Sequence, residues 1–405
     1  MPDSKRDYWL ILITSLIAIS FGVVFVARHL DSPSDGARIV PGGITSEGAL
    51  VNPLRGGVLQ QDDLVVAVEG RSLEAWAGSL FGNSSPPPAW NKGETLHYSV
   101  IRDGNPLDVR VTLGPYPLRE VFTNTWGTIV FALIFQIVAT FVFIRRPEHP
   151  AGRVLFLAAS CLTSSTAWSF GLRVRDLMDG VGFWLYKICT LFFYNLYWTA
   201  TLHFGLLFPR PLPVVQRRGV VPAMYVVPVL VLAAYLVAIY PISNDLLDWF
   251  SRWAAGEGVH SAVFLTLAVG VIFWQYRLNA TGATRQQIRW VILAGLISGG
   301  GGLLLYILPG ALGLEQISPN FLGLIIIPFP VALALAITRH QLWDIDLVVN
   351  RTIVYGALTA SVLALYAAIV GGMGLLFRTD DNLILPLLAT GLAAVLFYPL
   401  RLRLQ

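Results

Sequence analysis

YWLILITSLIAISFGVVFVA, the stretch at Tyr8–Ala27, contains no charged side chain and is long enough to cross a lipid bilayer as one helix. In lipid, the helix itself must satisfy every backbone polar group, so such a run predicts a membrane-spanning helix. No small-residue cleavage site precedes Arg28, which favours an uncleaved anchor over a signal peptide. Residues 1–29 are therefore expected to form a cytoplasmic tip followed by the first span.

The rest of the chain repeats this apolar pattern. Hydrophobic residues make up 55% of the 405 positions and charged residues 13%, well below the share that is usual in soluble domains. The sequence thus predicts a polytopic α-helical membrane protein with about ten transmembrane helices. The nine further apolar stretches lie at about 121–144, 154–172, 183–208, 220–240, 259–275, 290–308, 320–338, 352–377 and 383–400.

Basic residues set the expected orientation, because cytoplasmic loops carry an excess of Lys and Arg. With Lys5 and Arg6 inside, 15 basic residues fall in the inner segments, and the short outer loops carry only Arg173, Arg175, Arg252 and Arg378. The prediction is a multi-pass protein of the plasma membrane with both termini in the cytoplasm. The mixed, polar segment at 30–118 then lies outside.

Residues 30–118 have the pattern of a small α/β domain. Leu107–Leu113 alternates apolar and polar side chains, and the Asp103-Gly104 turn joins it to Leu96–Ile101, which predicts a β-hairpin. Leu64–Val68 is expected to be a short buried strand. The Pro-rich run 82–93 predicts a loop.

The segment Val51–Gly70, VNPLRGGVLQQDDLVVAVEG, resembles the helix-to-strand core of bacterial PDZ domains. It departs from that pattern at Asp62, where the family usually has glycine. The resemblance implies a PDZ-like domain that binds a peptide carboxylate through a glycine-rich loop while the peptide adds as a strand. The residues implied in that loop are Arg38, Gly42, Gly43 and Ile44. A PDZ-like module that only docks on the spans is the alternative.

Residues 119–405 carry a second resemblance. HFGLLFPR at 203–210, RQQIRWVILAG at 285–295 and RHQLWDIDLVVNRTIVYG at 339–356 occur in that order, and together they resemble the input regions of bacterial membrane sensor histidine kinases of the competence-pheromone type. The resemblance implies a nine-span sensor region that ends at the start of a cytoplasmic linker. It also implies an extracellular peptide or hydrophobic signal and a homodimer in the full-length kinase. The kinase domain is expected outside this chain, so no catalytic residue is assigned, and a truncated sensor and a natural stand-alone sensor both remain open.

Several further residues suggest signalling roles, each beside a simpler structural one. Trp249 and Trp253 belong either to an interfacial aromatic belt or to a surface for an apolar signal. His203 either bonds a neighbouring helix or takes part in sensing. Trp343, Asp344 and Asp346 either pair with nearby arginines at the membrane interface or relay a helix shift. A ridge of small residues recurs every four positions and favours either packing within one chain or a dimer interface: Gly356, Ala360, Ala364, Ala368 and Gly372.

Other functional classes lack their motifs. The sequence has no His-Glu-x-x-His metalloprotease motif, no Gly-x-Ser-Gly, no phosphate-binding loop and no Cys/His cluster, so no metal or cofactor is expected. The net charge of +4 does not suggest nucleic acid, and the expected partner is membrane lipid. A membrane transporter or a PDZ-bearing membrane scaffold remains the alternative function.

Overall fold

The computed structural model of the chain describes residues 4–81, 90–278, 291–295, 297–299, 301–302, 305 and 317–338. The chain forms two compact units. The first combines Met1–Asn124 with Phe143–Leu278, and the second combines Thr125–Val142 with Asn279–Gln405. The sheet and most of the described helices belong to the first unit.

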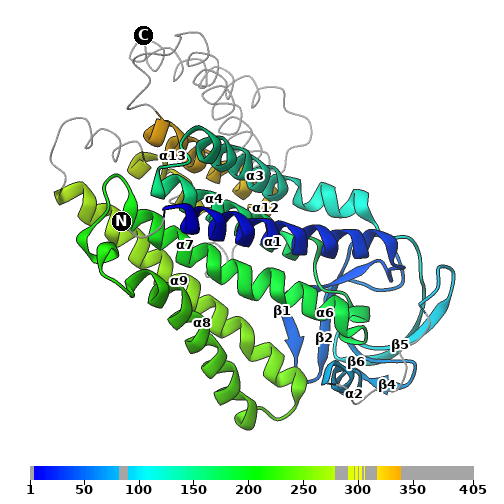
Figure 1. Cartoon of the computed structure of the whole chain (residues 1–405). Helices are drawn as coiled ribbons and strands as arrows, with labels where there is room; N and C mark the ends of the chain where they lie inside the picture. The colour runs from blue at the N-terminus through cyan, green and yellow to red at the C-terminus, as the bar shows by residue number, and fades with distance from the viewer. Residues whose placement is uncertain are drawn as a thin grey trace, which may run out of the picture. The chain divides into compact units, whose positions relative to one another are not determined.

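Four helices in the described residues are long and apolar enough to cross a membrane. They confirm helices at the predicted apolar stretches 8–27, 121–144, 220–240 and 259–275, and they make the fold compatible with a membrane protein that carries a small sheet domain (Figure 1). These helices are α1 (Ser4–Asp31), α3 (Leu118–Arg145), α8 (Val220–Ile239) and α9 (Leu246–Leu278).

The remaining apolar stretches are more broken than expected. The stretch 154–172 divides into α4 (Pro150–Ser165) and α5 (Ala167–Phe170), and α4 lies buried against α1 and α7 (Tyr194–Leu207). The stretch 183–208 comprises α6 (Gly180–Lys187), a π-helical segment, η3 (Ile188–Phe193), and α7. In the second unit, 320–338 divides into α12 (Pro319–Ile326) and α13 (Pro328–Thr338). Ten spans therefore remain a prediction, and the stretches at 352–377 and 383–400 lie outside the described residues.

The segment 241–258, between the predicted spans 220–240 and 259–275, was expected to be an outer loop and is instead mostly helix. A short 3₁₀ turn, η5 (Tyr240–Ile242), ends α8, and α9 begins at Leu246. Asp245 accepts a hydrogen bond from the backbone N–H of Asp248 at 2.7 Å, as an N-terminal cap does. Asp248 pairs with Arg252 one turn later at 3.0 Å. These local polar contacts stabilise the first turn of α9.

The sheet is antiparallel in the order β1-β2-β3-β5-β6, with the short β4 paired to β3. Val100 faces Leu107 across the β5–β6 hairpin, and Asp103 and Gly104 adopt positive φ angles of 50° and 78° in its turn, so the predicted hairpin is confirmed. The predicted strand at Leu64–Val68 is also confirmed. The strands are β1 (Ala37–Thr45), β2 (Gly48–Pro53), β3 (Asp63–Val68), β4 (Arg71–Ser72), β5 (Thr95–Arg102) and β6 (Asn105–Thr112).

The helix that the PDZ resemblance implies before Leu59 is not found. Residues Gly48–Pro53 form β2, and the chain then turns through bends to Asp63. Within the described part of 30–118, the helical elements are α2 (Leu73–Ala77) and the 3₁₀ turn η1 (Gly78–Phe81), both downstream of β3. At Asp62 φ is +65°, a conformation that glycine adopts without steric cost. Asp62, at which the resemblance leads one to expect glycine, therefore has a backbone conformation that favours glycine.

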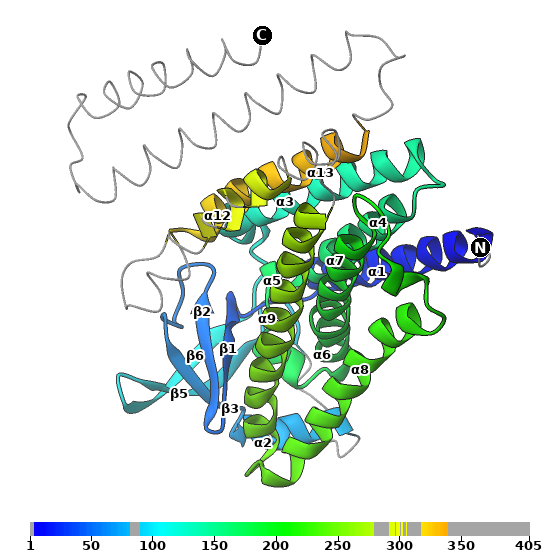
Figure 2. The same cartoon turned by 90° about the vertical axis from the view of Figure 1, so that its left-hand side faces the viewer.

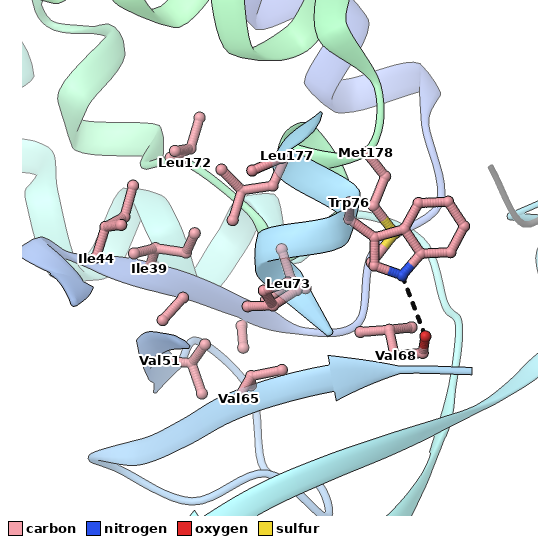
Figure 3. Packing of buried hydrophobic residues seen from close by; sticks show 14 of the residues in the cluster. Ile39, Ile44, Val51, Val65, Val68, Leu73, Trp76, Leu172, Leu177 and Met178 are labelled. Carbon is pink, nitrogen blue, oxygen red and sulfur yellow. Dashed lines mark hydrogen bonds between the residues drawn. The ribbon is translucent and has the colours of Figure 1, made fainter. Parts of the chain in front are cut away.

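One hydrophobic core joins the sheet to the helices. Val65 and Val68 from β3 and Leu73 and Trp76 from α2 are at most 5% exposed, and the Trp76 indole N–H donates to the Val68 carbonyl at 3.1 Å (Figure 3). The same core contains residues from 172–183 and from the first turns of α9. α9 passes beside β1 (Figure 2). The sheet thus shares its core with segments that follow it by 60 or more positions in the chain.

Candidate functional site

The junction between the sheet and the helices is the candidate functional site. At the outer edge of β1, the Ile39 N–H donates to the Leu172 carbonyl at 2.6 Å, and the Arg38 guanidinium donates to the Ser169 carbonyl at 2.9 Å. Between these acceptors lies Gly171, with φ +81°, and a Cβ there would meet the Arg38 side chain at 2.9 Å. The chain itself therefore pairs with the β1 edge at Ile39.

The residues implied in a peptide-binding loop separate in space. Arg38 lies at the junction, and Ile44 is 9% exposed and belongs to the core. Gly42 is exposed with φ +74°, whereas Gly43 is packed so closely that a Cβ would lie 2.9 Å from the Val40 carbonyl oxygen. A peptide that added along the whole β1 edge would displace the Ile39–Leu172 bond. Peptide binding by these residues stays a prediction.

A buried polar network links the end of α1 to the segment after α5. The Arg173 guanidinium donates to Asp176 at 2.9 Å and to the Ser32 hydroxyl at 2.7 Å. His29 Nε2 lies 3.6 Å from the Asp176 carboxylate and 3.2 Å from the Gly171 carbonyl. Burial alone would raise the pKa of Asp176, but the charge of Arg173 and its hydrogen bonds hold that pKa below its usual value. This segment includes a 3₁₀ turn, η2 (Val174–Leu177).

Two tyrosines extend the polar contacts from the sheet. The Tyr98 hydroxyl, on β5, donates to Asp35 at 3.1 Å, and burial raises the pKa of that carboxyl. The Tyr116 hydroxyl donates to the Phe170 carbonyl at 3.0 Å. Buried polar groups of this kind cost free energy when unpaired, so these bonds favour one docked position of the sheet.

A second attachment runs from α2 to α9. The two Glu74 carboxylate oxygens accept from the backbone N–H groups of Leu246 and Leu247, each at 3.0 Å. The first N–H groups of a helix have no partner within the helix, and its N-terminus carries partial positive charge. A side chain of the sheet domain therefore caps the helix α9.

Trp249 and Trp253 lie within this attachment. Their rings meet edge to face at 5.0 Å between centroids, and Trp253 is 3% exposed in the shared core. The Trp249 indole N–H donates to the Leu236 carbonyl at 2.9 Å. The structure thus places Trp253 in the packing between sheet and helices rather than on a free surface, and Trp249 half-buried beside it.

His203 is buried and bonds a neighbouring helix. Its Nδ1 lies 3.0 Å from the hydroxyl of Tyr225, which connects α7 to α8. An ion pair between Lys187 and Glu257 was not predicted from the sequence. Lys187 Nζ lies 3.8 Å from the Glu257 carboxylate and 4.9 Å from the centre of the Trp253 ring. Charged groups inside apolar segments are usually paired in this way.

Sequence reasoning missed the residues that make the junction. Arg173 was counted only as a loop charge, and His29, Asp176 and Glu74 were not singled out. The available signal was a cluster of four charges between two apolar stretches: Arg173, Arg175, Asp176 and Asp179. The predicted relay and ridge residues lie outside the described residues: Trp343, Asp344, Asp346, Gly356, Ala360, Ala364, Ala368 and Gly372.

The junction joins the sheet domain to helical segments through buried polar contacts. Among the described residues, no group of three or more His, Cys, Asp and Glu side chains is arranged to hold a metal ion. What the site provides is a set of buried hydrogen bonds and ion pairs between a sheet domain and apolar helices. No protein-family model, no curated protein and no solved structure matches the chain.

Proposed function

We propose that the chain is the signal-sensing membrane module of a two-component histidine kinase. In this proposal the PDZ-like sheet domain lies outside the cell, perceives a peptide or apolar signal, and biases the packing of the spans. The spans pass that bias to a cytoplasmic kinase domain. The three ordered motifs at 203–210, 285–295 and 339–356 support the choice of kinase.

One observation carries the sensor proposal. The loop charges predict that 30–118, 173–182 and 241–258 all lie outside, and residues from all three segments share one hydrophobic core: Val65 and Trp76, Leu177, and Leu247, Phe250 and Trp253. Segments on opposite sides of a bilayer do not share a core. The common core therefore agrees with the predicted alternation of spans.

Contacts at the opposite ends of the helices agree with this arrangement. The Tyr8 ring, near the predicted cytoplasmic end of α1, stacks on Phe143 at 5.1 Å between centroids. The Gln275 amide near the end of α9 donates to the Arg210 carbonyl at 2.9 Å. Both contacts join positions that the charge bias assigns to the cytoplasmic side.

The junction supplies a route for the signal. A ligand alters output only if it binds two arrangements of the protein with different affinity, and such coupling is typically about 1–3 kcal/mol. The bonds of Arg38 to Ser169 in α5 and of Glu74 to α9 connect the sheet directly to helical segments. A shift of the sheet therefore changes the forces on α5 and α9 without an intervening flexible loop.

The test joins the full chain to the phosphoacceptor and ATP-binding domains of a histidine kinase and measures autophosphorylation in membranes. We expect Glu74→Ala to change the basal rate, because it removes the cap on α9. The matched control is Glu47→Ala, at an exposed hairpin turn of the same sheet. If both variants match the parent chimera, the sheet does not communicate with the spans, and the scaffold or transporter alternative gains support.

A further inference from the structure

The outer edge of β6 is an unpaired edge of the sheet. β6 ends the strand order, and its strand partner among the described residues is β5. The opposite edge differs, because β1 already pairs with the chain itself through the bond from the Ile39 N–H to the Leu172 carbonyl. An unpaired edge presents backbone N–H and C=O groups to which an extended peptide can add as a further strand.

The turn of the β5–β6 hairpin determines which backbone groups of β6 are available. The positive φ angles of Asp103 and Gly104 are those of a type I′ turn, so Arg102 and Asn105, which close it, form a hydrogen-bonded pair. Hydrogen-bonded and non-hydrogen-bonded pairs then alternate along the hairpin. The odd-numbered residues of β6 therefore bond to β5, and the even-numbered residues direct their backbone groups to the outer edge.

Three of these even-numbered residues offer both a donor and an acceptor. They are Asp108, Arg110 and Thr112, and no hydrogen bond across the outer edge is found among the described residues. Pro106, at the start of the strand, has no N–H and offers its carbonyl alone. The edge can thus pair with a strand that extends from Thr112 to Pro106.

The side chains along this edge carry opposite charges in a fixed order. Asp108 and Arg110 are exposed, and because they lie two positions apart in a strand they share one face of the sheet. The Arg110 side chain has no partner among the described residues, and Asp108 accepts one hydrogen bond, from the Ser99 hydroxyl at 2.8 Å. Opposite charges directly across an antiparallel pair stabilise it, and like charges destabilise it. The edge therefore favours an acidic residue opposite Arg110 and a basic residue opposite Asp108.

The other face of β6 favours an apolar neighbour. Val109 and Val111 are 6% and 4% exposed and hold β6 in the core, whereas Leu107, on the same face, is 43% exposed. An apolar side chain opposite Leu107 would remove apolar surface of both residues from water, which is favourable.

We infer that the outer edge of β6 binds an extended peptide that runs antiparallel to β6 and has the order acidic, apolar, basic, apolar from its N-terminal end. The acidic residue lies opposite Arg110, the basic residue opposite Asp108 and the second apolar residue opposite Leu107. Charges on a sheet edge exclude most strands, and here their order admits a strand of complementary charge. This edge is separate from the glycine-rich loop in β1. The site rests on the proposed function for its biological role, as the place where a peptide signal is recognised, but binding is measured without a kinase.

The first test compares two peptides of identical composition on the purified full chain in phosphatidylcholine nanodiscs. The matched peptide is acetyl-Thr-Val-Glu-Val-Lys-Leu-Ser-amide, and the control peptide exchanges its Glu and Lys. Fluorescence anisotropy of labelled peptide measures binding, with empty nanodiscs as the blank. We expect the matched peptide to bind about tenfold more tightly, because both of its charges meet the opposite charge. Equal affinities, or no saturable binding below about 1 mM, overturn the inference and leave the outcome of the kinase chimera unaffected.

Methylation of the peptide backbone tests whether the peptide adds as a strand. The N–H of its Lys, opposite Asp108, points toward β6, and the N–H of the preceding Val points away. N-methylation at Lys should weaken binding by about tenfold, because it removes a hydrogen bond and places a methyl group in the interface. N-methylation at that Val should leave the affinity unchanged. Equal effects of the two methyl groups show that the peptide is held by charge alone and overturn the inference.

Exchange of the two charges in the protein gives an independent test. Asp108→Lys combined with Arg110→Glu alters exposed side chains and keeps the backbone of the edge. This double variant should bind the control peptide about tenfold more tightly than the matched peptide. The matched control variant is Glu47→Lys combined with Arg55→Glu, at exposed positions of the same domain outside β6, and it should keep the parent's preference. A preference for the matched peptide that survives the exchange at positions 108 and 110 overturns the inference.

Discussion

Arg173 and Asp176 are buried at 4% and 0% side-chain exposure, which is costly for charged groups unless they are paired and hydrogen-bonded. Asp176 also restricts position 182 to glycine, because a Cβ at Gly182 would lie 2.4 Å from the Asp176 Oδ1 atom. The pair therefore acts through position: it holds the segment after α5 against Ser32 at the end of α1. Its contribution to net stability is smaller than the loss expected when one partner is removed.

Arg173→Met should destabilise the protein by about 3 kcal/mol, because it leaves Asp176 charged and buried without its partner. Arg173→Met combined with Asp176→Leu should recover most of that loss. Thermal unfolding in detergent measures both, with the exposed Arg119→Met as control. A double variant as unstable as the single one would show that the cost comes from packing and not from the unpaired charge.

Some features of single residues could be predicted from the sequence, and others could not. Asp62 was recognised as a departure from glycine, and its φ of +65° explains the position in physical terms. The contact between His29 and the Gly171 carbonyl could not be predicted from the sequence, because the two residues are separated by 142 positions. Local patterns do not encode such pairings; only the docked fold brings them together.

Among the elements, β3 and β5 are joined by a bidentate ion pair as well as by their backbone bonds. The Arg102 guanidinium donates to both oxygens of Asp63, each at 2.7 Å, and the Gln60 N–H donates to the same carboxylate at 2.8 Å. Two-point pairing of this kind is stronger than a single contact. The hydrogen bonds from Arg102 are the main reason that the pKa of Asp63 is lowered.

This lowered pKa predicts an acid-sensitive sheet. The folded state holds Asp63 in its charged form more strongly than the unfolded state does, so the stabilisation is complete above the unfolded pKa of about 3.9 and is lost as pH falls through the lower folded pKa. Asp63→Asn should be less stable than the parent at about pH 6 and should lose less stability on acidification to about pH 3. Thermal unfolding at the two pH values measures this difference. Equal losses in parent and variant would contradict it.

The elements differ in how readily they could be predicted. The β5–β6 hairpin followed from alternation and an Asp-Gly turn, both of which are local signals. The first turns of α9 fall in 241–258, which lies between the predicted spans 220–240 and 259–275. The start of α9 has a local cap, Asp245, and a distant one, Glu74, which lies more than 170 positions earlier; the first can be found in the local sequence and the second cannot.

For the whole molecule, the shared core predicts that the sheet and the α8–α9 connection are accessible from the same side of the membrane. Ser46→Cys and Asn244→Cys should react with a membrane-impermeant maleimide on intact cells, whereas Arg217→Cys should react only after permeabilisation. All three positions are exposed, and the native Cys161 and Cys189 are 0% exposed and should give little background. Labelling of positions 46 and 244 from opposite sides would contradict the proposed topology.

During synthesis, the outer edge of β1 stays open until Leu172 has been made. The strand pairs of the sheet lie entirely within residues 37–112 and require nothing that comes later in the chain. Leu172 follows the end of β6 by about 60 residues. At a translation rate of about 5–20 residues per second, the outer edge of β1 therefore stays unpaired for roughly 3–12 s. An unpaired edge is a template for strands of other chains. Slow translation between the sheet and Leu172 therefore raises the risk of aggregation, and slow translation after Leu172 does not.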